Sequence, residues 1–92
     1  MTDGQASISA EILARYARDA ALEVEGVRGL SGRRGARVRE DRVELRLEVE
    51  WGASIPAVGA DVRARVGDYL RQMAALAPER IEVIVERVGP TQ

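Results

Sequence analysis

Six arginines lie within a short, glycine-rich stretch of the sequence, residues 28–42, and these are the side chains best suited to bind a ligand. They are Arg28, Arg33, Arg34, Arg37, Arg39 and Arg42. Only Glu40 and Asp41 oppose them, so the stretch carries +4, and the net charge of −1 leaves −5 for the other residues. Guanidinium groups bind carboxylates and phosphates. The stretch therefore indicates either a contact with an anionic partner or a solvated loop.

A GxxG pattern opens this stretch at Gly29, Leu30, Ser31 and Gly32. In KH domains such a loop clamps the nucleic-acid backbone, but it joins two helices. Here we expect it to join a helix to a strand, so a mobile connection with solvated arginines is favoured. An RNA-binding module that uses the loop 26–39 is kept as the alternative. Anionic lipid headgroups are another alternative, in a weak and salt-sensitive association.

The side chains that most often carry catalysis or bind metals are missing. The chain has no histidine and no cysteine, which removes the commonest general base, the commonest metal ligands and the strongest nucleophile. No dinucleotide-binding or P-loop glycine pattern is found either. We therefore expect no enzymatic activity, no cofactor, no metal site and no small-molecule substrate.

The spacing of apolar residues predicts the elements that position the arginines. One helix begins at Ser9 and ends at Gly26, and a second opens at Ser54-Ile55-Pro56 and stops before Pro78. Strands are expected at 36–39, 42–51 and 80–88. The order α-β-β-α-β predicts an α/β fold of the two-layer α+β type, with two helices packed on one face of a three-stranded mixed sheet.

The register of the first two strands can also be predicted. Pairing Val38 with Val43 aligns the apolar positions and places Arg37 opposite Glu44. Trp51 ends the apolar, core-facing row of the second strand. The opposite face of the sheet is expected to be mostly acidic and unsuited to phosphate, with Ile84 as its one apolar residue. The candidate interaction residues are Arg28, Arg33, Arg34, Arg37 and Ile84.

Residues 1–92 have the length of one domain, for which we expect an ordered core at about 8–88 and short polar tails. The absence of cysteine excludes disulfides. No apolar run approaches the roughly 20 residues that span a bilayer, and the polar first residues do not resemble a signal peptide. A cytoplasmic location is the expectation.

Five segments in this order resemble the alkaline shock protein family, the envelope stress response family of Gram-positive bacteria. They are Gly4 with Ile8-Ser9, Ala20–Val27, Leu47–Gly52, Ser54–Pro56 with Val58 and Val62, and Ile81–Val85 with Val88. The most recognisable is the E-V-x-G-V sequence that ends at Val27. Three positions depart from the family pattern: Ala74-Ala75 stand where the family often has Thr-Gly, and Glu82 stands where it usually has Asn.

The resemblance implies a non-enzymatic protein linked to alkaline or cell-envelope stress. It implies a protein-interaction or scaffold role in the cytoplasm, peripheral at the inner face of the cell membrane. The expected partner is another protein, such as a small integral membrane protein, together with self-association.

Overall fold

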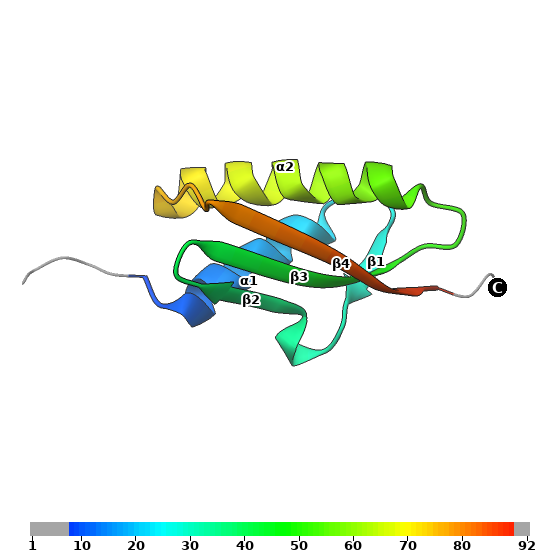
Figure 1. The fold of residues 1–92 in the computed structure, drawn as a ribbon, viewed down its shortest axis with the longest axis horizontal. Helices are drawn as coiled ribbons and strands as arrows, with labels where there is room; N and C mark the ends of the chain where they lie inside the picture. Colours follow the sequence, from blue (N-terminus) through cyan, green and yellow to red (C-terminus); the bar gives the residue numbers. More distant parts are fainter. Residues whose placement is uncertain (1–7, 90–92) are drawn as a thin grey trace, which may run out of the picture.

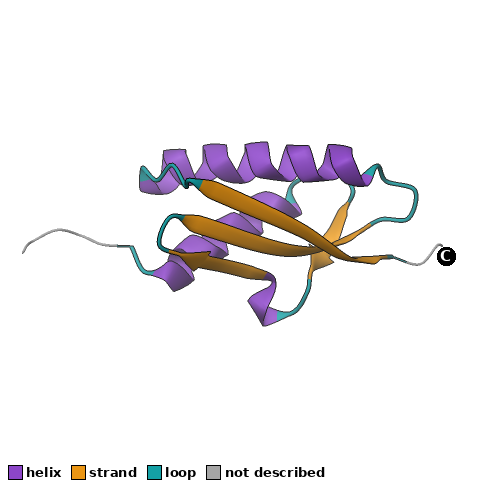
Figure 2. Ribbon diagram, viewed as in Figure 1, coloured by secondary structure: helices purple, strands orange, loops and turns teal. Residues whose placement is uncertain are grey.

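The computed structural model describes residues 8–89, in which two helices and four strands form two layers (Figures 1 and 2). The elements are α1 (Ala10–Leu22), β1 (Val27–Leu30), the 3-10 turn η1 (Arg33–Gly35), β2 (Ala36–Arg39), β3 (Arg42–Val49), α2 (Ile55–Ala74) and β4 (Arg80–Val88). The predicted Gly4 motif and the polar tails lie outside the described residues. The architecture is the predicted α+β fold, with one more short strand than expected.

Both helices begin at a serine, as predicted. The Ser9 hydroxyl accepts a 3.2 Å hydrogen bond from the Ile12 N–H, and the Ser54 hydroxyl accepts one of 3.3 Å from the Ala57 N–H. These hydroxyls satisfy backbone donors that have no partner within the helix. Both helices end earlier than the sequence suggested, α1 at Leu22 and α2 at Ala74.

The sheet is mixed, with β3 at its centre. β4 pairs with one edge of β3 in parallel, while β1 and β2 both pair with the other edge in antiparallel fashion, along different halves of β3. In the hairpin, Val38 lies opposite Val43 and Arg37 opposite Glu44. The predicted register is therefore confirmed.

The segment after α1 is not the mobile connection that was expected. Residues 27–30 form β1, with Val27 opposite Val49 and Leu30 opposite Leu47, and Leu30 is buried. The strand forms because β2 covers only the first half of β3, and the second half would otherwise keep an unpaired edge. The prediction of a wholly solvated loop was wrong at this point.

Both helices cover one face of the sheet, and the core lies between the two layers (Figure 2). The alternating residues of β3 face this core and are almost fully buried: Val43, Leu45, Leu47 and Val49. Trp51 does not continue this row and is 65% exposed. It lies in a turn beyond the end of β3, so the expectation that it faces the core was wrong.

Candidate functional site

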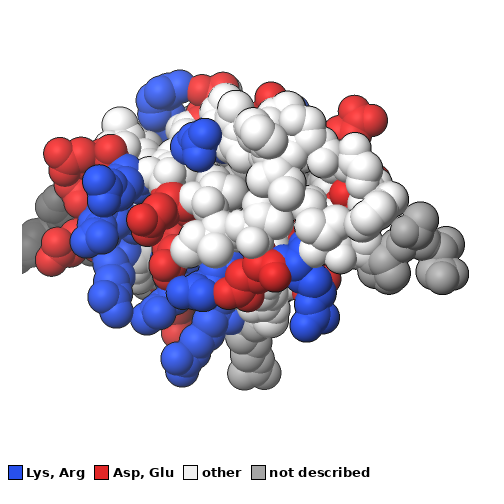
Figure 3. Space-filling view, turned by 45° about the vertical axis from the view of Figure 1, so that its right-hand side comes forward, with Lys and Arg blue, Asp and Glu red and all other residues white. Residues whose placement is uncertain are grey.

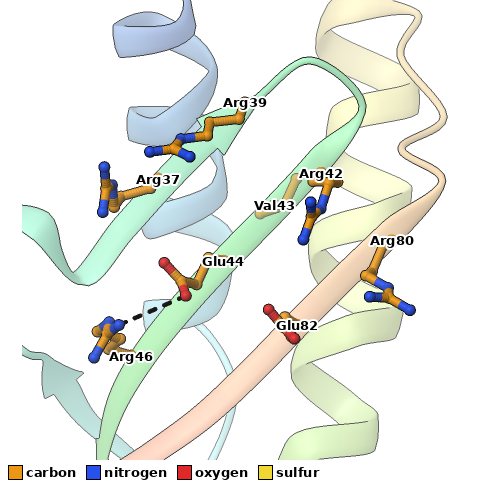
Figure 4. A pocket seen from close by; sticks show the side chains of 8 residues that line it. All are labelled: Arg37, Arg39, Arg42, Val43, Glu44, Arg46, Arg80 and Glu82. Carbon is orange, nitrogen blue, oxygen red and sulfur yellow. Dashed lines mark ion pairs between the residues drawn. The ribbon is translucent and has the colours of Figure 1, made fainter.

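In the part of the chain that the structure describes, residues 8–89, no helix covers the other face of the sheet (Figure 2). Its exposed side chains are those that alternate with the core residues of β2, β3 and β4. Figure 4 views part of this face, with the helices behind the strands and the labelled charged side chains on the open side; Val43, also labelled, belongs to the core. We call it the uncovered face.

A hollow of about 220 Å³ lies on the uncovered face near the β2–β3 turn (Figure 4). Its lining residues are Arg37, Arg39, Arg42, Val43, Glu44, Arg46, Arg80 and Glu82. Five guanidinium groups from three strands thus surround two carboxylates, a charge surplus of +3. We call this group of residues the arginine hollow.

Three of the arginines form a row across the sheet. Arg39 lies opposite Arg42 in the β2–β3 ladder, and Arg42 lies opposite Arg80 in the β3–β4 ladder. Like charges in directly opposite positions destabilise a sheet. Asp41 and Glu79 line a neighbouring shallow hollow together with Arg42 and Arg80.

Among residues 8–89, Arg46 is the one arginine of the hollow that is held by ion pairs. Arg46 lies 2.7 Å from Glu86 and 3.6 Å from Glu44. The hydrogen bond from Arg46, with a smaller contribution from Ser31, lowers the pKa of Glu86, and the bond to Glu86 raises the pKa of Arg46. Among residues 8–89, no carboxylate lies within 4.0 Å of the guanidinium groups of Arg37, Arg39, Arg42 or Arg80. Their charge is thus available to an external anion.

The prediction that this face is mostly acidic was wrong at the hollow. The outward residues of β2 are both arginines, and β3 and β4 each begin with an arginine on the same side. The acidic residues Glu48 and Glu86 lie further along β3 and β4, where they line a separate shallow hollow. The face is therefore basic at one end and acidic at the other.

The five candidate residues from the sequence do not form one site. Arg37 lines the arginine hollow, and Ile84 lies on the uncovered face opposite Arg46. Arg28 projects from β1 and lies against Gly89, where it leaves no room for a Cβ atom. Arg34 is exposed in η1, whereas the side chain of Arg33 lies outside the description.

Sequence reasoning did not name Arg39, Arg42, Arg46 or Arg80 as candidate interaction residues, although all four line the hollow. Arg42 had been counted in the charged stretch, but nothing in the sequence alone pairs it with Arg80. Only the parallel register of β3 and β4 brings the two together.

The GxxG segment does not form a nucleic-acid clamp of the KH type. Gly29 and Leu30 belong to β1, and the Ser31 N–H donates a 2.9 Å hydrogen bond to the Arg46 carbonyl. These backbone groups are therefore engaged in the sheet.

Residues 8–89 offer neither a metal-binding cluster nor a membrane-spanning helix. No group of three or more carboxylate, histidine or cysteine side chains is placed to hold a metal ion in this part of the chain. None of its helices is both long and apolar enough to cross a membrane.

Neither a family model nor a curated protein matches this chain. Several forms of the MamM CTD are among the solved structures that resemble it. A copper form is 22% identical with a TM-score of 0.64, covering 86% of this chain and 98% of that one. A cadmium form is 24% identical with a TM-score of 0.63 and the same coverage. A nickel form is 22% identical with a TM-score of 0.62, covering 84% of this chain and 96% of that one.

This likeness shows that the chain shares the α+β fold of the MamM CTD. At such identities it shows the fold alone. The metals named for those structures belong to that protein, and the chain described here has no histidine or cysteine to offer a metal.

Proposed function

We propose that this chain is a non-enzymatic protein-interaction module that binds an acidic segment of another protein in the arginine hollow. The row of Arg39, Arg42 and Arg80 carries this proposal. Three adjacent guanidinium groups repel one another when the hollow is empty, and a bound carboxylate relieves that repulsion.

The rest of the uncovered face favours a protein over a nucleic acid. Glu44 and Glu82 line the same hollow, and the apolar Ile84 lies beside them. A nucleic-acid backbone carries a negative charge at every nucleotide, including those beside these carboxylates, whereas an acidic peptide segment can place a basic or apolar side chain there. Modules that bind single-stranded RNA use aromatic stacking platforms. Here the two tyrosines pack against the core, and the exposed Trp51 lies beyond the end of β3 and does not line the hollow.

We further propose that the module serves in the cell-envelope or alkaline stress response, as the resemblance to the alkaline shock protein family implies. In this role it would act in the cytoplasm, held at the inner face of the membrane by a small membrane protein. An acidic juxtamembrane segment of that protein would suit the arginine hollow.

Binding of a fluorescein-labelled oligo-glutamate peptide, followed by anisotropy at two salt concentrations, tests the proposal. We expect salt-sensitive binding that is lost in an Arg39→Glu/Arg42→Glu variant. Arg15→Glu/Arg63→Glu is the matched control, because it makes the same change in net charge at two exposed positions on α1 and α2 that do not line the hollow. Equal loss in the control would show that net charge alone is responsible. Tighter binding of an RNA oligonucleotide of the same charge would replace the proposal with the RNA-binding alternative.

A pull-down of tagged protein from gently crosslinked cells then identifies the natural partner. A membrane protein that is recovered after nuclease treatment, and lost with the Arg39→Glu/Arg42→Glu variant, would support the envelope role. Recovery of RNA-binding proteins that vanish with nuclease would contradict it.

A further inference from the structure

The two edges of the sheet differ in a way that points to a second interaction surface. The edge formed by β1 and β2 is made of two four-residue strands interrupted by η1, and Arg37 and Arg39 project beside it. Short, interrupted and charged edges resist pairing with another strand. The opposite edge is the nine-residue β4, and no other strand among residues 8–89 pairs with its outer side.

The core-facing side of β4 is incompletely covered. Ile81, Val83 and Val85 pack against the core but remain only half-buried, unlike the fully buried residues of β3 beside them. Val88, at the end of the strand, is 41% exposed. Figure 3 shows an uncharged area above the band of charged side chains, at the level of α2 and β4. A long apolar edge of this kind is a template for pairing with another strand.

The sequence of β4 is complementary to itself in one antiparallel register. When Val83 lies opposite Val83 of a second copy, Ile81 faces Val85 on the core side. On the uncovered face, Arg80 then faces Glu86, so that each end of the paired segment carries an ion pair. The bulge between Val85 and Arg87 ends the regular strand at this same point.

Two neighbouring registers would also keep the apolar side chains on the core side and the charged ones on the uncovered face. Both of them place like charges opposite one another. If the pairing is centred on Glu82, this carboxylate lies opposite itself. If it is centred on Ile84, Glu82 lies opposite Glu86. Like charges directly opposite one another destabilise a strand pair, so the register centred on Val83 is favoured.

We propose that two copies of this chain associate through antiparallel pairing of their β4 strands about Val83. The two sheets then form one continuous sheet, and the half-buried apolar row of β4 continues from one copy into the other. The two-fold axis is perpendicular to the sheet, so both arginine hollows lie on the same side of the dimer. The interface shares Arg80 and Glu82 with the lining of the arginine hollow, but self-association can be measured without any ligand for the hollow.

Cysteine crosslinking of the intact chain tests the register. Because the chain has no native cysteine, any disulfide that forms must join the introduced residues. Opposite Cα atoms in an antiparallel pair are about 4.5–5.5 Å apart, within reach of a disulfide. Val83→Cys is therefore expected to give a covalent dimer on mild oxidation. Ile81→Cys alone is expected to stay monomeric, because its two copies would lie about 14 Å apart. The Ile81→Cys/Val85→Cys double variant is expected to crosslink again. Equal crosslinking of the Ile81→Cys and Val83→Cys variants would overturn the register.

Sedimentation velocity over a range of protein concentrations tests the dimer itself. Arg80→Glu and Glu86→Arg are each expected to weaken self-association about tenfold, since each places like charges opposite one another twice in the dimer. The Arg80→Glu/Glu86→Arg variant is expected to regain association, and Arg39→Glu, on the other edge, to leave it unchanged. Circular dichroism of each variant confirms folding. The proposal is contradicted if the wild-type chain stays monomeric at every concentration, or if the double variant does not regain self-association. Neither outcome depends on the result of the oligo-glutamate experiment.

Discussion

Arg46 Nη1 lies 2.7 Å from Glu86 Oε2 and joins β3 to β4 on the uncovered face. This contact, with Ser31, lowers the pKa of Glu86 in the folded protein. A depressed folded pKa contributes stability that is present above the unfolded pKa, about 4.3, and is lost as the pH falls through the folded value.

We therefore expect Glu86→Gln to be less stable than the wild type at neutral pH, and the difference to shrink in acid. Urea unfolding at pH 7 and below pH 4 measures it. Glu48→Gln, a change on the same face without an ion pair among the described residues, is the control. A difference that stays constant across this pH range would contradict the role assigned to Glu86.

The row of Arg39, Arg42 and Arg80 should cost the folded chain stability. Arg42 is the central residue, with a like charge opposite it on both sides. We expect Arg42→Gln to raise the free energy of unfolding by about 0.2–1 kcal/mol in low salt. Added salt should shrink the gain, because it screens exposed charges.

The matched control for this row is Arg63→Gln, which changes an exposed arginine on α2. If Arg42→Gln raises the free energy of unfolding but lowers the affinity for the peptide, the arginine row serves binding at a cost in stability. A loss of stability in Arg42→Gln would instead mean that neighbouring carboxylates already balance these charges.

Gly26 is required where α1 connects to β1. Its φ is +97°, and a Cβ atom there would lie 2.8 Å from Val58 Cγ2 of α2. We expect Gly26→Ala to destabilise the protein by about 1–3 kcal/mol, measured by urea unfolding. Gly29→Ala is the control, since no atom lies within 4 Å of a Cβ built there. Equal effects of the two substitutions would refute the special role of Gly26.

Leu30 tests whether residues 27–30 form a strand or a mobile loop. Its side chain is only 8% exposed and belongs to the core. We expect Leu30→Ala to cost about 2–4 kcal/mol of unfolding free energy. Leu22→Ala, at a position 45% exposed, should cost much less. A negligible effect at Leu30 would restore the loop description.

The parts of this fold that the sequence predicts are those with local signals. The serine caps, the apolar stripes of the helices and the alternation in β3 each lie within one segment, and the hairpin register follows from adjacent residues. β1 was missed because it is short, contains Gly29, and pairs with a strand that comes later in the chain. Trp51 was misplaced because the alternation continues in the sequence after the strand has ended.

The arginine hollow could be predicted only in part. Arg37 and Arg39 belong to the basic stretch that the sequence reveals. Arg80 lies beside these residues only because α2 connects the end of β3 to a parallel strand, β4, that starts next to the start of β3. Pairing between parallel strands depends on a long crossover, and no local pattern specifies its register.

The parallel pairing of β3 with β4 also determines how long β3 stays exposed to other chains during synthesis. β3 leaves the ribosome well before β4, and α2 lies between them. Until β4 is added, β3 offers an apolar, half-paired strand to any exposed strand nearby, including that of another nascent chain. A chaperone that covers β3 until β4 has been synthesised would therefore matter more for this protein than for one built from consecutive hairpins.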